Sequence, residues 1–318
     1  MTGPSGGAPA RAARETSVQV AGGPLAVTHW PGEPSAEPVI ALHGITANGL
    51  FLAPLAQELA GTPIHAPDLR GRGASRDLPG PYGLAAHVAD VVALADTLDR
   101  RPVLLGHSMG AFIGALAAAD HPERFSRLVL VDGGLGFPSP PGTDVDAVLE
   151  AVIGPAMRRL SMTFPDRESY HAFFRDHPAL ADHWGPELRA YFDRDLVGTP
   201  PELRSSCSVD AVRLDGADVL TGPETLAAIH RLALPTTLLW AERGLLNQPE
   251  ALYDEARIEA AGLDRKLITV AGVPDTNHYS ILLAPHALRA VAEAVLRRPP
   301  RRGPAAPPAT PPRSGGCR

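Results

Sequence analysis

Cysteine is scarce in this sequence, and long apolar runs are absent. Only Cys207 and Cys317 occur among 318 residues, which excludes a disulfide-stabilised scaffold and a cysteine-rich zinc site. No run reaches the ~18 consecutive apolar residues that a transmembrane helix needs, so no membrane span is expected. The first 16 residues contain arginines but no apolar segment after them, unlike a secretory signal. We therefore expect a soluble, cytoplasmic protein.

Basic residues are few outside the C-terminal end. Six of the 29 lysines and arginines fall within residues 297–318, which hold no acidic residue, so residues 1–296 carry 23 basic and 35 acidic side chains. An acidic body without a basic stripe excludes a typical nucleic-acid-binding protein. Seven of the last 20 residues are proline, and we predict a disordered tail over residues 298–318. Residues 1–16 are predicted to form a second disordered tail.

Between these tails, strand and helix patterns alternate along most of the chain. Short apolar runs, typical of strands buried on both faces of a sheet, precede stretches with apolar residues at helical spacing. The predicted strands are residues 17–20, 25–30, 38–42, 63–66, 102–105, 127–131, 235–240 and 266–270. The predicted helices are residues 50–59, 84–98, 109–119, 249–261 and 280–296, the last interrupted by Pro285. This alternation predicts an α/β fold with a mostly parallel, doubly wound sheet.

One segment, residues 137–234, breaks the alternation, because it contains helix-length patterns but no convincing strand. We expect it to be a helical cap inserted into a core made of residues 17–136 and 235–297. Half of the sixteen aromatic residues lie in its first part: Phe137, Phe164, Tyr170, Phe173, Phe174, Trp184, Tyr191 and Phe192. Two interpretations stay open. At least three of these rings face a ligand pocket, or they only fill the small core of the cap.

A serine lies at the junction of a predicted strand and a predicted helix, in Gly106-His107-Ser108-Met109-Gly110. On a sharp strand-to-helix turn its hydroxyl is presented above the sheet, and the flanking glycines leave room for the strained backbone. The helix N-terminus adds free N–H groups beside that hydroxyl. Ser108 is therefore the candidate nucleophile.

The loop His43-Gly44-Ile45-Thr46, after an earlier strand, is the second candidate element. Acyl transfer needs N–H donors aimed at the developing oxyanion. We expect the Ile45 and Met109 N–H groups to supply them. His43 is interpreted as a residue that braces this loop by hydrogen bonds rather than as a base.

The candidate base is His278, within Asp275-Thr276-Asn277-His278-Tyr279-Ser280. A serine hydroxyl needs a neighbouring base with a pKa near neutral, and histidine suits that task. Among twelve histidines, His278 lies downstream of the serine in a loop after a strand, as the order serine, acid, histidine requires. His107 adjoins Ser108 but is expected to point away.

Taken together, these motifs resemble those of the α/β-hydrolase-fold serine hydrolases with a helical cap, over residues Val18 to Leu296. Asp68-Leu69-Arg70-Gly71-Arg72-Gly73-Ala74-Ser75 is similar to the loop that follows the fourth strand in that family. The resemblance implies an α/β-hydrolase fold and a Ser–acid–His triad. The segment after Asp132 falls where that family carries its cap.

The acid departs from the family pattern. The usual aspartate follows the seventh strand in a run resembling W-G-x-x-D, whereas here Trp240-Ala241-Glu242-Arg243-Gly244 has glycine in its place. Three candidates remain. Asp132 ends the preceding core strand, where some relatives place their acid; Glu242 lies two residues early with a longer side chain; Asp275 precedes the histidine by three residues. We favour Asp132. The alternative is that this residue has a structural role only and caps the turn before Gly133.

The predicted reaction is hydrolysis of a small to medium, largely apolar carboxylic ester through an acyl-enzyme. No cofactor or metal is expected, and Gly71-Arg72-Gly73 lacks the Lys-Ser/Thr of a phosphate-binding loop. Carbon–carbon bond, lactone and thioester hydrolysis use similar constellations and stay open. A rival of another class is a ligand-binding or regulatory protein with slow turnover. The sequence predicts no oligomeric state.

Overall fold

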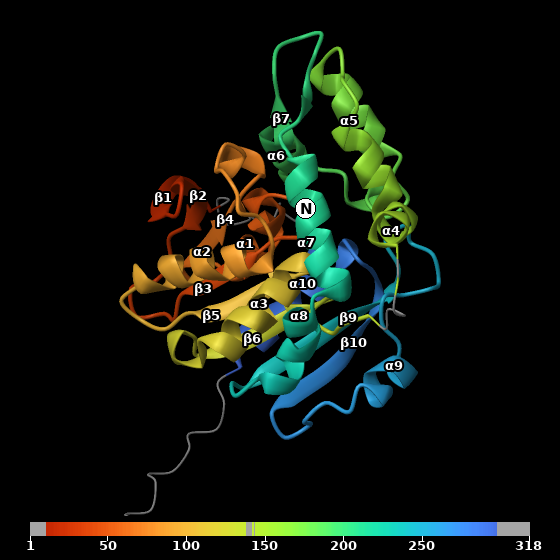
Figure 1. Cartoon of the computed structure of the whole chain (residues 1–318). Coiled ribbons are helices and arrows are strands. Elements are labelled where there is room, and N and C mark those ends of the chain that lie inside the picture. Colours follow the sequence, from red (N-terminus) through yellow and green to blue (C-terminus); the bar gives the residue numbers. More distant parts are fainter. Residues whose placement is uncertain (1–10, 138–141, 143, 298–318) are drawn as a thin grey trace, which may run out of the picture.

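The computed structural model describes residues 11–137, 142 and 144–297. Its centre is an eight-stranded sheet in the order β1-β2-β4-β3-β5-β6-β9-β10 (Figure 1). The strands are β1 Arg14–Val20, β2 Gly23–Trp30, β3 Val39–Leu42, β4 Ile64–Pro67, β5 Val103–His107, β6 Arg127–Val131, β9 Thr236–Arg243 and β10 Ile268–Asn277. From β4 to β10 all neighbours are parallel, and the β1–β2 hairpin joins β4 antiparallel. The predicted α/β fold with a mostly parallel sheet is confirmed.

Helices cover both faces of the sheet. On one face lie α1 (Ala53–Glu58) and α10 (Pro285–Leu296), and on the other α2 (Leu84–Asp96), α3 (Met109–Asp120), α8 (Pro223–Ala228) and α9 (Glu255–Ala260). Successive strand residues divide between the two cores: Leu105 packs with α1 and α10, whereas Leu104 packs with α2 and α3. This two-sided burial explains why the central strands read as continuous apolar runs.

Above the sheet in Figure 1, a group of helices forms the region predicted as the cap. It contains α4 (Val145–Leu160), α5 (Arg167–Arg175), α6 (Pro186–Asp195) and α7 (Val209–Thr221). The prediction of no strand here was wrong in one detail, because β7 (Leu196–Val197) and β8 (Arg204–Ser205) form a short antiparallel ladder. The cap limits stay a prediction; α8, within them, packs on α3 of the core.

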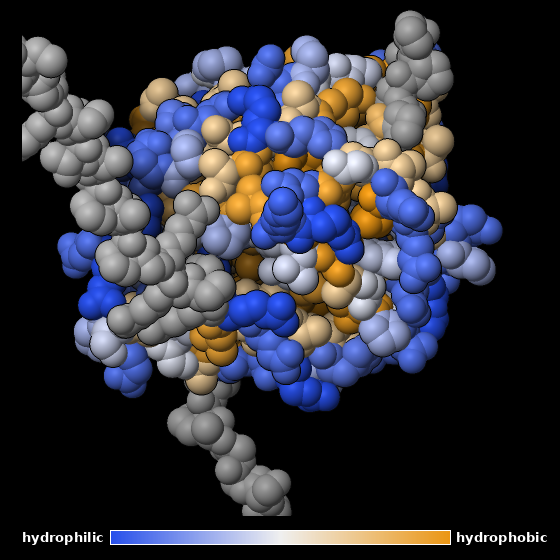
Figure 2. Space-filling model, turned by 90° about the horizontal axis from the view of Figure 1, so that it is seen from below, coloured by the Kyte–Doolittle hydropathy of each residue, from blue (hydrophilic) through white to orange (hydrophobic). Residues whose placement is uncertain are grey.

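Short 3-10 helices complete the described chain. They are η1 Gly49–Leu52, η2 Gly73–Ser75, η3 Pro122–Arg124, η4 Ala181–His183, η5 Ile229–Arg231 and η6 Ser280–Leu282. The helix expected over residues 280–296 is divided into η6 and α10, because Pro285 occupies the first turn of α10, where the missing N–H costs nothing. Figure 2 shows the end opposite the cap, where apolar and hydrophilic residues are intermixed.

The two predicted tails are only partly covered by the structure. Residues 1–10 and 298–318 lie outside the described residues. Strand β1 already begins at Arg14, and the Arg11 guanidinium donates to backbone carbonyls of Trp30 and Leu59. Among the described residues, none of the helices combines the length and the apolar character that a membrane span requires.

Candidate active site

Ser108 occupies a strained turn between β5 and α3. Its φ of 55° and ψ of −124° lie in a backbone region that residues other than glycine rarely adopt. A Cβ added at Gly106 would lie 2.1 Å from the Gly110 carbonyl oxygen, and one added at Gly110 would lie 2.4 Å from the carbonyl oxygen of Leu42. Only glycine fits at either position, so the backbone can pass close to itself and to β3. The spacing of the motif therefore has a steric cause.

His278 follows directly after β10, and Asp132 follows β6. The imidazole Nδ1 lies 2.6 Å from Oδ2 of Asp132, a carboxylate with no exposed surface. The other oxygen, Oδ1, accepts a hydrogen bond of 3.0 Å from the backbone N–H of Ala241. With both oxygens engaged, the carboxylate holds the proton of the imidazole on Nδ1 and leaves Nε2 free to accept one.

The other two acid candidates are engaged elsewhere. Glu242 is exposed, and its Oε2 accepts a hydrogen bond of 3.1 Å from the backbone N–H of Asp275. The Asp275 carboxylate is 85% exposed and lies 3.5 Å from Arg243 Nη2. Of the three candidates, Asp132 is the one that contacts His278 among the described residues.

All five residues predicted for the site line one cavity. Ile45, Ser108, Met109, Asp132 and His278 meet there, although they come from segments more than 200 residues apart. A neighbouring cavity shares Ile45, Ser108 and His278 with it and is also lined by Gly44. We call this shared space the catalytic cleft. Its lining includes the residues that carry the expected hydroxyl, imidazole and two backbone N–H donors.

The loop of residues 43–46 is held by hydrogen bonds to three successive carbonyl oxygens. His43 Nδ1 lies 2.7 Å from the Gly44 oxygen, Arg72 Nε donates to the Ile45 oxygen at 2.9 Å, and Arg159 Nη2 donates to the Thr46 oxygen at 3.2 Å. The Gly44 carbonyl belongs to the same peptide unit as the Ile45 N–H. Fixing that carbonyl therefore fixes the direction of the N–H, which lies on the opposite side of a planar trans peptide.

His43 is suited to this bracing role because it stays neutral. Its Nε2 accepts a hydrogen bond of 2.9 Å from the backbone N–H of Leu69, which places the ring proton on Nδ1. Complete burial lowers the pKa of His43 to about 3. The contacts agree with the expected bracing function and leave the ring no free nitrogen to act as a base.

His107 corrects one expectation, because it does not point away from the site. Its ring centroid lies 4.7 Å from that of His278, and its Nε2 lies 2.7 Å from the His278 carbonyl oxygen. Burial lowers the pKa of His107 well below its usual value, so the ring is neutral and donates through Nε2. The sequence predicts that this side chain points away, and nothing in the spacing signals the contact with His278.

The catalytic cleft includes an apolar compartment and shares Thr46, Phe51, Tyr191 and Tyr279 with a second, aromatic one. The aromatic compartment is walled by Phe51, Phe173, Phe174, Tyr191, Phe192 and Tyr279. The apolar compartment is walled by Phe112, Phe137, Leu149, Val219, Leu220 and Leu252. Five of the eight aromatic residues noted in the sequence therefore line a compartment, whereas Phe164 and Tyr170 pack edge to face inside the cap. In the described chain no group of three or more metal-ligating side chains occurs.

Comparison with known proteins agrees with this architecture. A family model described as alpha/beta hydrolase fold matches residues 37–285. The sequence is 32% identical over 163 residues to the lipase LipV of Mycobacterium tuberculosis, covering 51% of this chain and 58% of that one. It is 38% identical over 112 residues to the N-formylmaleamate deformylase of Pseudomonas putida, covering 32% and 42%. The chain thus spans about half the length of these relatives.

Solved structures share the fold over nearly the whole chain. E-2-(acetamidomethylene)succinate hydrolase superposes with a TM-score of 0.73 at 23% identity, covering 89% of this chain and 99% of the other. The thioesterase domain from the curacin biosynthetic pathway gives a TM-score of 0.69 at 22% identity, with coverages of 90% and 99%. At sequence identities this low, the similarity establishes a shared fold and no more.

Proposed function

The chain belongs to the α/β-hydrolase fold family, and on that premise we propose that it is a serine hydrolase that cleaves a carboxylic ester through an acyl-enzyme on Ser108. The proposal rests on one observation. Ser108, His278 and Asp132 line the same cavity, and His278 Nδ1 lies 2.6 Å from Asp132 Oδ2. A nucleophile, a base and a group that orients the base are the minimum set for this chemistry.

In the first half-reaction, His278 Nε2 takes the proton of the Ser108 hydroxyl while Oγ attacks the acyl carbon. The carbonyl oxygen becomes an oxyanion, and the Ile45 and Met109 N–H groups donate to it, each worth about 3 kcal/mol of transition-state stabilisation. The bond to the leaving alcohol then breaks, and the imidazolium returns its proton to the alcohol oxygen. Asp132 stabilises the imidazolium in between.

In the second half-reaction, water replaces the alcohol. His278 removes a proton from the water as its oxygen attacks the acyl carbon of the acyl-enzyme. The ester bond to Ser108 breaks, and the serine oxygen takes the proton back from the imidazolium, which releases the carboxylic acid. This step needs no group beyond those of the first.

The two compartments support a substrate with apolar or aromatic groups on either side of the scissile bond, since apolar walls with a few placed polar groups are typical of small-molecule sites. The proteins similar to this chain are named a lipase, a deformylase and a thioesterase domain. Ester hydrolysis is our proposal, and thioesters are the second class to test.

The test is a panel of 4-nitrophenyl esters and thioesters with acyl chains of two to eight carbons, run beside labelling with a fluorophosphonate probe. We expect wild type and Ser35→Ala, a variant at an exposed serine, to be labelled and to turn over. Ser108→Ala should lose both. Turnover that survives in Ser108→Ala would contradict the proposal, and a folded wild type that resists the probe yet binds an apolar ligand would favour a binding protein.

A further inference from the structure

A buried cation lines the aromatic compartment. Arg159, on α4, is 2% exposed and faces the walls formed by the phenylalanine and tyrosine rings, with its guanidinium carbon 5.3 Å from the centre of the Phe174 ring. The described lining of this compartment contains no aspartate or glutamate. Arg159 therefore brings a guanidinium to this lining, in surroundings where water screens charge weakly.

Not every N–H group of the Arg159 guanidinium is hydrogen-bonded within the described part of the protein. Its Nη1 donates to Asp195 at 2.8 Å and to the Tyr170 hydroxyl at 3.1 Å, and its Nη2 donates to the carbonyl of Thr46 at 3.2 Å. Nε is buried and has no hydrogen-bond partner among the described residues. An unpaired buried N–H destabilises the folded protein, and more strongly when the group is charged. The Nε–Nη2 edge is also the edge with which arginine binds a carboxylate through two parallel hydrogen bonds.

Asp195 is the counterion of Arg159, but it pairs with Nη1 and leaves Nε without a partner in the described chain. Its oxygens accept hydrogen bonds from the Ser205 and Ser206 hydroxyls, at 2.9 Å in each case, and from the Tyr170 hydroxyl. None of these four residues is part of the described lining of the compartment. Asp195 thus holds the guanidinium at Nη1, from outside the compartment lining, and fixes its orientation. Such supporting contacts keep a binding group rigid.

Two tyrosines add neutral donors on the route to the serine. Tyr191 and Tyr279 line both the aromatic compartment and the catalytic cleft. Burial raises the pKa of both hydroxyls, so they stay protonated and able to donate. The compartment therefore combines flat apolar walls, one fixed guanidinium and hydroxyl donors.

We propose that the aromatic compartment is a carboxylate subsite, in which Arg159 binds the carboxylate of a substrate that also carries the scissile ester. This inference rests on the proposed function and narrows its substrate class to an acidic ester with an apolar or aromatic body. It predicts that a free carboxylate on the substrate accelerates hydrolysis rather than impeding it, although desolvating an unpaired carboxylate is costly.

Two measurements test the subsite. The first is kcat/KM for 4-nitrophenyl glutarate, which has a free carboxylate, against the ester whose chain ends in a carboxamide. The second is calorimetric binding of phenylacetate against phenylacetamide, which involves no catalysis. We expect wild type to favour the carboxylate at least tenfold in both. Arg159→Met should bring both carboxylate-to-carboxamide ratios close to one. Arg159→Lys should leave intermediate ratios, because lysine keeps the charge but cannot donate two parallel hydrogen bonds to a carboxylate.

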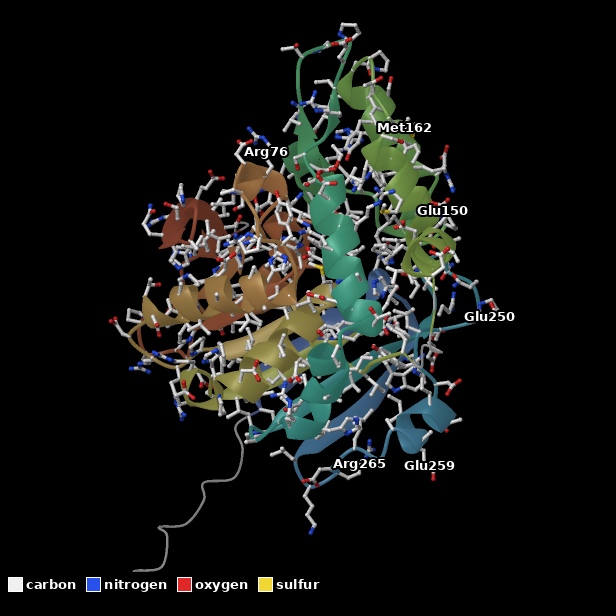
Figure 3. The ribbon with its side chains drawn as sticks, in the orientation of Figure 1. Arg76, Glu150, Met162, Glu250, Glu259 and Arg265 are labelled. Carbon is white, nitrogen blue, oxygen red and sulfur yellow. The ribbon has the colours of Figure 1, made fainter. Side chains whose placement is uncertain are left out.

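Arg158→Met is the matched control. Arg158 is the adjacent residue on α4, is 63% exposed and pairs at 2.9 Å with Glu150, which points outward from the helix (Figure 3). Its replacement should leave both ratios as in wild type. Using ratios removes any general loss of activity that follows from releasing the Thr46 carbonyl.

The outcomes separate the two proposals. If both esters resist hydrolysis but phenylacetate binds in an Arg159-dependent way, the subsite is supported and ester hydrolysis is contradicted. If both esters are cleaved equally and phenylacetate binds no better than phenylacetamide, the subsite is wrong and ester hydrolysis stands. Should Arg159→Met fail to fold, the wild-type ratios decide alone, and ratios near one overturn the subsite.

Discussion

Replacing Asp132 by asparagine should abolish most of the activity without changing the shape of the site. In the structure Oδ1 of Asp132 accepts from the Ala241 N–H at 3.0 Å, and Oδ2 faces Nδ1 of His278 at 2.6 Å. An asparagine keeps the first bond only by placing its amide oxygen there. Its NH₂ group then faces Nδ1, which has to accept, so the imidazole carries its proton on Nε2 and can no longer take one from Ser108.

The magnitude follows from that reversed tautomer. Loss of the correct tautomer in a triad costs about 10⁴ in kcat, equivalent to about 5 kcal/mol of transition-state stabilisation. The matched control is Glu242→Gln, since Glu242 is exposed and glutamine can still accept from the Asp275 N–H. We expect that control to stay within about threefold of wild type.

The assay is steady-state hydrolysis of a 4-nitrophenyl ester, with circular dichroism and thermal unfolding to show that both variants fold. Asp132→Asn should be folded and nearly inactive. The reasoning would be refuted by Asp132→Asn with activity within tenfold of wild type, and most directly if Glu242→Gln were the inactive variant.

Four further predictions concern the surroundings of the triad. His107→Leu should lower kcat about tenfold, because the His278 carbonyl loses its donor, whereas His107→Gln, which can donate, should lose less. The pKa of His43 lies near 3 in the folded protein and near 6.5 in the unfolded chain, so its contribution to stability is full above pH 6.5 and falls as the pH drops toward 3. Between pH 7.5 and pH 5, the free energy of unfolding should fall by about 2 kcal/mol less in His43→Gln than in wild type. Urea unfolding at the two pH values measures this difference. Gly106→Ala should prevent folding or lower Tm by more than 10 °C, because its Cβ would lie 2.1 Å from a carbonyl oxygen, while Gly114→Ala, with 3.3 Å to a side chain, should be milder. A chain ending at Arg298 should keep its kcat, and a large loss would show that the tail takes part.

The parts that sequence predicts best are those with local causes. Strand β5, the turn at Ser108 and helix α3 follow one another directly, and the two glycines have steric reasons that act within a few residues. The acid is different. Asp132 reaches His278 only because β6, β9 and β10 lie side by side in that order, which places Ala241 of β9 against the carboxylate. No spacing along the chain carries that information.

Arg158 and Arg159 illustrate the same limit within the cap. They are neighbours on one helix and look equivalent in the sequence, yet one is 63% exposed and the other 2%. The difference arises from the tertiary contacts of Arg159 with Tyr170 and Asp195, which propensity and periodicity do not determine. The two-residue ladder of β7 and β8 was missed for a related reason, since so short a strand shows no alternation.

The loop of residues 43–46 is held from both the sheet region and the helices above it. A buried loop must satisfy its carbonyl groups, and the three donors come from His43 in the loop itself, Arg72 in the loop after β4 and Arg159 in α4. A backbone conformation persists at a functional site when its surroundings over-determine it. Because Arg159 belongs to α4, that helix both lines the aromatic compartment and helps to fix the loop that carries the Ile45 N–H.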